Sequence, residues 1–128
     1  MKRSLLEMYA LAVCFVTVTC LAIVTGIAIY DVVQIAAPEI TLHSFKYERH
    51  QSNAAFRDSD HPDPKAVAAL PEEEITKRRQ ESYVSTLNAE RRDGWQSLLR
   101  MAIIMVIDII FFVIHWQLAK RARESVGA

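Results

Sequence analysis

The apolar segment from Trp95 to Arg121 constrains the fold of this chain most. Between Trp95 and Trp116 it contains a single acidic residue, Asp108, close to its middle. A helix needs about 20 consecutive apolar residues to cross a hydrocarbon layer about 30 Å thick. The segment therefore predicts a membrane span, and an ionisable side chain inside a span is a candidate functional residue.

A second apolar segment, from Leu5 to Tyr30, follows Lys2 and Arg3 at the other end of the chain. It is longer than the apolar region of a secretory signal, which reaches only about 15 residues, so an uncleaved membrane anchor is predicted. The helix is expected to continue to residue 37. It should end there because the residue before Pro38 resists the helical conformation.

The polar middle of the chain divides into a loop and a charged helix. His43, Phe45 and Tyr47 alternate, which suggests a short extended segment, and the stretch from Asp58 to Pro64 is rich in turn-forming residues. Pro71 followed by three glutamates is typical of a helix start. A nearly continuous helix is expected from Glu72 to about residue 124.

These observations predict an all-α membrane protein. Its fold is expected to be a two-span helical hairpin with a long charged extramembrane helix that continues into the second span. The predicted parts are an N-terminal tail (1–4), a first transmembrane helix with its extension (5–37), an irregular extramembrane loop (38–70), a charged extramembrane helix (71–94), a second transmembrane helix (95–118) and a basic C-terminal tail (119–128).

Four aromatic residues are expected to anchor the spans at the two membrane surfaces, where Trp and Tyr are enriched. Tyr9 and Tyr30 are 21 residues apart, as are Trp95 and Trp116. In a helix this is roughly 31 Å, close to the hydrocarbon thickness. In an antiparallel hairpin Tyr9 is then level with Trp116, and Asp108 is level with Thr17.

Asp108, Thr17 and His115 are predicted to form intramembrane polar contacts. Asp108 has two functional readings: a hydrogen bond or charge pair that holds helices or subunits together, or a proton or ion site. His115 as a haem ligand would need a second histidine inside a span, which the chain does not supply. A possible ion pair joins Asp31 and Arg100 near the other end of the spans.

Two further sets of residues are candidates for packing. Ala22 and Gly26 form a pair of small residues four apart, which allows close approach of another helix. The face that carries Ala10, Cys14, Thr17, Leu21, Thr25 and Ala28 is the better candidate for packing on another helix. On the charged helix, Tyr83, Val84 and Leu87 form a narrow apolar stripe. It suits either a docking partner or a largely solvated stalk.

Several function classes receive no support from the sequence. The net charge is zero, which argues against nucleic-acid binding. The motifs of phosphate-binding loops, nucleophile elbows and zinc proteases do not occur. The spacing of His43, His50, His61 and the nearby aspartates matches no zinc or calcium pattern. We therefore expect no enzyme activity, no cofactor and no metal.

The sequence favours a small accessory or scaffold subunit of a larger membrane complex. The alternative is a homo-oligomeric proton or ion pathway lined by Asp108; a weaker third reading is a sensor with a ligand-binding loop. The expected location is the cell inner membrane, with the lipid bilayer and other membrane subunits as partners. The basic residues near both ends favour cytoplasmic termini and an outer loop over 38–94, because a loop this long crosses largely regardless of its charge.

Overall fold

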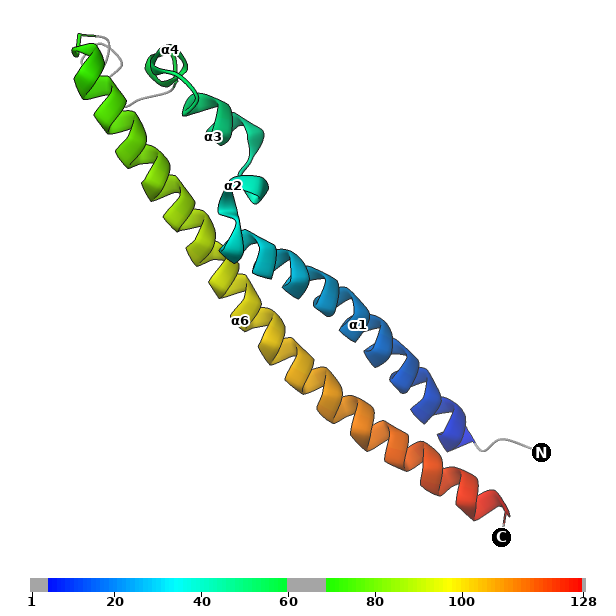
Figure 1. Cartoon of the computed structure of the whole chain (residues 1–128). Helices are drawn as coiled ribbons and strands as arrows, with labels where there is room; N and C mark the ends of the chain where they lie inside the picture. Colours follow the sequence, from blue (N-terminus) through cyan, green and yellow to red (C-terminus); the bar gives the residue numbers. More distant parts are fainter. Residues whose placement is uncertain (1–4, 60–68, 128) are drawn as a thin grey trace. The chain divides into compact units, whose positions relative to one another are not determined.

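The computed structural model describes residues 5–59 and 69–127, and these form five helices (Figure 1). They are α1 (Leu5–Ala36), α2 (Pro38–Thr41), α3 (Ser44–Arg49), α4 (Asn53–Arg57) and α6 (Glu72–Gly127). The structure is 90% helix, and its described ranges contain no strand. The predicted all-α class is confirmed. The predicted N-terminal tail (1–4) and most of the turn-rich stretch, with Asp60, His61 and Asp63, lie outside the described residues.

Two helices, α1 and α6, are each long and apolar enough to cross a membrane. α1 ends at Ala36, and the next residue, Ala37, leaves the helical region with φ −138° and ψ 67°. This is the expected effect of Pro38 on the residue before it. α6 is unbroken from Glu72 to Gly127, so the charged segment and the apolar segment belong to one helix.

Two parts of the predicted organisation need correction. The loop over 38–70 is not wholly irregular, because it contains α2, α3 and α4. The expected extended segment at His43, Phe45 and Tyr47 is instead the start and body of α3. The His43 Nδ1 accepts a hydrogen bond from the Phe45 main-chain N–H at 3.4 Å, which caps the helix.

The other correction is smaller and concerns the end of α6. The helix reaches Gly127, three residues beyond the expected end at about residue 124, so the basic segment predicted over 119–128 belongs to α6. Ala119 and Ala122 are only 4% and 5% exposed, so the helix packs there.

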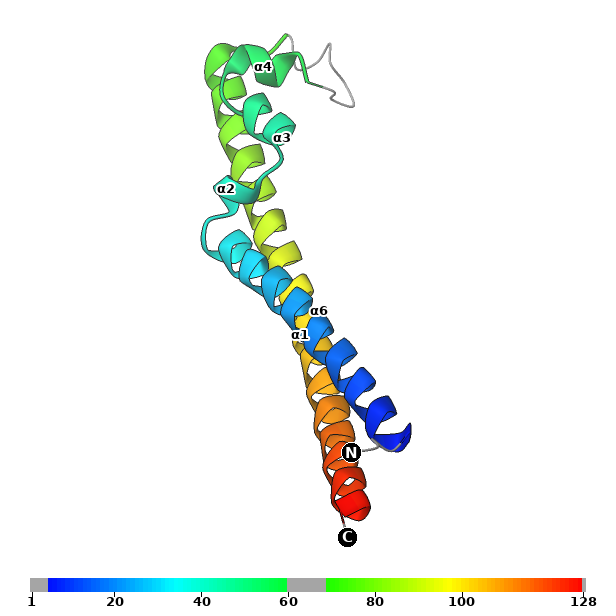
Figure 2. The ribbon, with the colours of Figure 1, turned by 90° about the vertical axis from the view of Figure 1, so that its right-hand side faces the viewer.

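The structure divides into two compact units. The apolar unit comprises Met1–Asp31 and Gln96–Ala128, and the polar unit comprises Val32–Trp95. Within the apolar unit α1 and α6 run side by side in opposite directions (Figures 1 and 2). Tyr9 contacts His115, and Cys14 lies 3.9 Å from the main-chain oxygen of Phe112.

The face of α1 that packs in the apolar unit has a heptad-like spacing. Its buried residues are Glu7, Ala10, Cys14, Thr17, Val24, Ala28 and Asp31. Intervals of three and four residues keep one stripe facing a neighbouring helix. The small side chains in this stripe allow the two backbones to approach closely.

The polar unit is organised around the N-terminal half of α6. Its most buried side chains are Pro38, Leu42, Phe56 and Ile75, with Ile75 completely inaccessible. Gln34, at the end of α1, donates a hydrogen bond to the Glu90 carboxylate of α6 at 2.8 Å. A core this small makes each apolar residue in it important for stability.

Replacing Ile75 with alanine is expected to destabilise the polar unit by about 2–4 kcal/mol, because it removes buried methyl groups and leaves a cavity. Hydrogen exchange of the α4 amides in detergent-solubilised protein measures the effect, and their protection should fall. Val84→Ala is the matched control, since Val84 is on the same helix but 56% exposed. Equal loss of protection in both variants would contradict the proposed core.

Candidate functional site

A line of polar side chains runs along the contact between α1 and α6 in the apolar unit. We call it the polar seam, and it consists of Glu7, Cys14, Thr17 and Cys20 on α1 and of Asp108, His115 and Arg123 on α6. Such groups are costly in a hydrocarbon environment unless protein atoms satisfy them. Their arrangement therefore decides what the two helices can do.

Asp108 is half-buried on α6, and the Cys20 thiol of α1 is the side chain that interacts with it electrostatically across the contact. The Asp108 Oδ2 atom is buried and has no hydrogen-bond partner in the structure. Thr17, predicted to be level with Asp108, instead donates its hydroxyl to the main-chain oxygen of Cys14 at 2.9 Å. This internal bond is common for a helical threonine, and it leaves Asp108 with the side chain one turn further along α1.

His115 lies toward the basic end of the seam. Its Nδ1 is 2.8 Å from the main-chain oxygen of Phe111, so Nδ1 must carry the proton, because a carbonyl can only accept. The ring stacks on Phe111 and meets the Tyr9 ring edge-on, with both centroid distances at 6.0 Å. Thr17 and His115 thus each bond to a carbonyl of their own helix, and no hydrogen bond joins either of them to Asp108 among the described residues.

An ion pair that the sequence did not predict closes the seam at its basic end. The Arg123 Nε donates to the Glu7 Oε1 at 3.1 Å. The Glu7 side chain is 6% exposed and that of Arg123 is 62% exposed. A sequence signal did exist, because Glu7 falls on the same heptad stripe as Ala10 and Cys14, where an acid is unusual without a partner.

The possible ion pair between Asp31 and Arg100 does not appear among the salt bridges of the described residues. Asp31 is 2% exposed, and its Oδ2 atom has no hydrogen-bond partner. Arg100 is exposed, whereas the neighbouring positions Ser97 and Met101 are half-buried. Arg100 therefore points away from the seam, because it is one residue out of step with the packed stripe of α6.

The other predicted positions in the apolar helices lie outward. Ala22 and Gly26 are exposed, and a Cβ atom added at Gly26 would meet nothing within 4 Å. The packed side of α1 is close to the better candidate face, which includes Ala10, Cys14 and Thr17, with Val24 in place of Thr25. The four aromatic positions Tyr9, Tyr30, Trp95 and Trp116 are all more than half exposed.

The residues of the predicted docking stripe on the charged helix do not all face the same way: some pack within the polar unit and one is exposed. Tyr83 packs on the His50 ring at a centroid distance of 5.4 Å, and Leu87 is half-buried. Val84 is exposed. The chain's own α3 and α4 region therefore occupies part of this stripe.

His50 lies at the centre of the polar unit, although the sequence marks it only as one of several histidines whose spacing matches no metal site. It is 7% exposed, and its Nδ1 donates to the Lys46 main-chain oxygen at 2.6 Å. Its Nε2 is 3.1 Å from the Ser82 hydroxyl, and its main-chain oxygen accepts from Arg79 at 2.6 Å. Because Phe56 and Tyr83 also pack on the ring, the His50–Ser82 pair ties α3 to α6 and is not an open nucleophile–base pair.

A second group of contacts fixes α4 to the start of α6. The Asn53 amide donates to the Glu72 Oε2 at 2.7 Å and to the Thr76 hydroxyl at 2.9 Å. Arg57 forms a 2.7 Å salt bridge with the Glu72 Oε1. The Asn53 hydrogen bond, with a further contribution from the Arg57 charge, holds the pKa of Glu72 below its ordinary value.

The contacts around Glu72 predict that α4 loosens from α6 in acid. A lowered pKa in the folded state contributes stability above the ordinary glutamate pKa of about 4.3, and this is lost as the pH falls through the lowered value. The Asn53 side-chain amide signal in an NMR titration from about pH 6 to about pH 3 should report the loss. Glu72→Gln should show a loosened α4 already at neutral pH, while Glu73→Gln, its exposed neighbour, should titrate like the parent. An Asn53 signal that does not change with pH in the parent would contradict the assignment.

Comparison of this chain with protein-family models, with characterised proteins and with solved structures finds no match. Functional proposals for it therefore rest on its own residues and contacts.

Proposed function

We propose that this chain is a small two-span integral membrane protein that acts as an accessory or scaffold subunit of a larger membrane complex. In this proposal α1 and the apolar part of α6 form a hairpin across the cell inner membrane. The termini are cytoplasmic, and the polar unit lies outside. Larger membrane proteins pack on the surfaces that the hairpin leaves uncovered.

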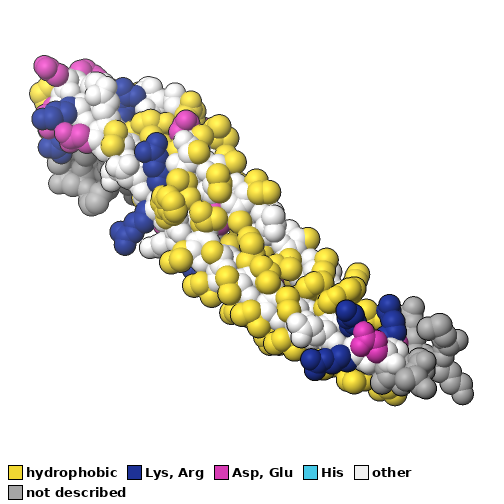
Figure 3. Space-filling view, turned by 60° about the horizontal axis from the view of Figure 1, so that its bottom comes forward, with side chains coloured by type: hydrophobic (Ala, Val, Ile, Leu, Met, Phe, Trp, Pro, Cys, Tyr) yellow, Lys and Arg dark blue, Asp and Glu magenta, His cyan; other side chains and the backbone are white. Residues whose placement is uncertain are grey.

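The exposure of the apolar helices is the observation that carries this proposal. Only 22% of the most apolar window of α1 is buried within the structure, and none of the corresponding window of α6 is buried. Hydrophobic side chains cover the face of the apolar helices seen in Figure 3. Exposure of such a surface to water costs roughly 25 cal/mol of free energy per Å² of apolar area. The proposal therefore places lipid or other apolar helices over it.

Two buried carboxylate oxygens provide a second reason to expect partner subunits. The Oδ2 atoms of Asp31 and Asp108 have no hydrogen-bond partner in the part of the chain that the structure describes. An unsatisfied polar group away from water costs about 1–3 kcal/mol, and a charged one costs more. A donor from a neighbouring subunit would remove this cost, which favours an assembly over an isolated hairpin.

The outward position of Ala22 and Gly26 also suits a partner helix. Small residues four apart on an exposed face allow another backbone to approach closely, and this close packing drives association in lipid. Because the pair does not face α6, its packing role would be directed to another chain.

A proton or ion pathway is the alternative function, and the unpartnered Asp108 Oδ2 atom is the observation that favours it. His115, two turns along the same helix, would be the next proton-binding group. Proton or ion flux through vesicles that contain only the purified chain would support this alternative, provided that Asp108→Asn abolishes it. An absence of proton or ion flux in these vesicles, together with larger proteins that co-purify with the chain, would favour the accessory role.

Asp108→Leu is expected to release co-purifying membrane subunits from the gently solubilised chain, because leucine offers no polar contact. Asp108→Asn should retain more of them, since its amide still forms hydrogen bonds. Gel filtration of an affinity-tagged form measures both results. Asp93→Asn is the matched control, an exposed acid on the same helix outside the apolar segment. An intact complex in both Asp108 variants would contradict the assembly role.

A further inference from the structure

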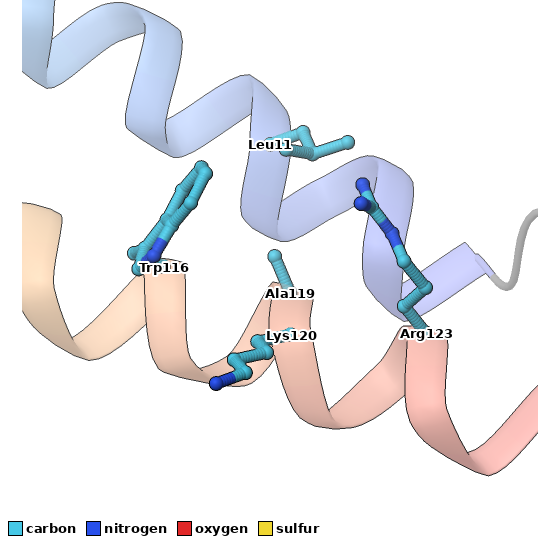
Figure 4. A pocket seen from close by; sticks show the side chains of 5 residues that line it. All are labelled: Leu11, Trp116, Ala119, Lys120 and Arg123. Atoms are coloured by element: carbon cyan, nitrogen blue, oxygen red, sulfur yellow. The ribbon is translucent and has the colours of Figure 1, made fainter.

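A small groove lies at the basic end of the apolar unit, between α1 and α6 (Figure 4). It encloses about 70 Å³ and is lined by Leu11, Trp116, Ala119, Lys120 and Arg123. Leu11 comes from α1, and the other four residues come from successive turns of α6. The groove thus combines an apolar floor with two cationic side chains.

The order of these residues along α6 matches the order of chemical groups in a phospholipid. Trp116 is the expected interfacial residue, and Lys120 and Arg123 follow it by four and seven residues. At the helical rise these positions lie roughly 6 and 10 Å further along the axis, at or just beyond the depth of the headgroups. The apolar floor faces acyl chains, while the cations reach phosphate depth.

The two cations are arranged differently. The Arg123 guanidinium reaches across to α1, where its Nε donates to Glu7 (Figure 4). A guanidinium has five N–H donors, and this side chain is 62% exposed, so the group can bind Glu7 and a phosphate together. Lys120 lines the groove with its stem and extends its ammonium away from α1.

We infer that this groove binds the headgroup of an anionic phospholipid, an inference that rests on the membrane placement proposed above. Charge supports this occupant, because Lys120, Arg121 and Arg123 outnumber the nearby acids Glu7 and Glu124.

Tryptophan quenching by brominated lipids tests this directly. The chain has two tryptophans, so Trp95→Phe leaves Trp116 as the only reporter. The variant is reconstituted in phosphatidylcholine vesicles that contain equal mole fractions of either brominated phosphatidylglycerol or brominated phosphatidylcholine. We expect phosphatidylglycerol to associate about fivefold more strongly, the effect of one well-placed cation at a membrane surface.

Three further substitutions in the Trp95→Phe background distinguish a specific headgroup site from nonspecific electrostatic attraction of anionic lipid. Arg123→Gln should reduce the preference to near unity, whereas Arg121→Gln, an equal charge change on an exposed neighbour outside the groove lining, should keep most of it. Glu7→Gln should raise the preference, because the carboxylate no longer competes with phosphate for the guanidinium. A merely structural ion pair would make Glu7→Gln and Arg123→Gln change the preference in the same direction.

The remaining outcomes distinguish a failure of the headgroup site from a failure of the proposed function. Equal quenching by the two lipids in the parent would overturn the headgroup site and leave the proposed function intact. An equal loss of preference in Arg121→Gln and Arg123→Gln would also overturn the headgroup site, because the lipid would then respond only to the total positive charge. Quenching by neither lipid would show that Trp116 is not in the membrane, and the proposed function would fail together with the site.

Discussion

Every polar group on the contact between α1 and α6 must find its partner in protein if lipid surrounds the two helices, because lipid supplies none. The Thr17 hydroxyl donates a hydrogen bond to a main-chain oxygen of its own helix, and the His115 ring does the same with the Phe111 oxygen. Glu7 forms an ion pair with Arg123 across the seam. Asp108 is satisfied only in part, through Cys20, and keeps one oxygen without a partner. The seam is therefore mostly self-sufficient. The polar group it leaves incomplete is the one for which a neighbouring subunit matters most.

The polar unit follows a different physical rule. It has few apolar residues to bury, so its short helices depend on hydrogen bonds as much as on packing. His50 connects α3 to α6 through both of its ring nitrogens, and Asn53 and Arg57 connect α4 to Glu72. Such contacts fix the orientation of the short helices and add little net stability, because water offers the same groups equivalent hydrogen bonds in the unfolded chain. They nevertheless order helices of four to six residues that would not form alone.

Helix length and apolar periodicity were predictable from the sequence. The end of α1 before Pro38 and the continuous α6 follow from proline geometry and from the absence of a helix-breaking proline between Glu72 and Gly127. Most of the inner face of α1 was predictable from the helical spacing of Ala10, Cys14 and Ala28, although Val24 is buried where Thr25 was expected. The pairs Glu7–Arg123 and His50–Ser82 join residues far apart in the chain, and neither follows from local spacing. Asp31 and Arg100 lie at similar levels by residue spacing, but Asp31 is buried and Arg100 is exposed, and no salt bridge joins them among the described residues.

In the proposed hairpin α1 and α6 lie antiparallel in the membrane, with Cys14 opposite Phe112. Disulfide trapping in native membranes tests it most directly. With Cys20 replaced by alanine, Phe112→Cys should form an oxidant-induced cross-link to the native Cys14 within one chain. The matched control keeps Cys20, replaces Cys14 with alanine and carries the same Phe112→Cys change; it should not react, because Cys20 is six residues, roughly 9 Å, further along α1. Cross-linking of the control alone, or of neither pair, would contradict this arrangement.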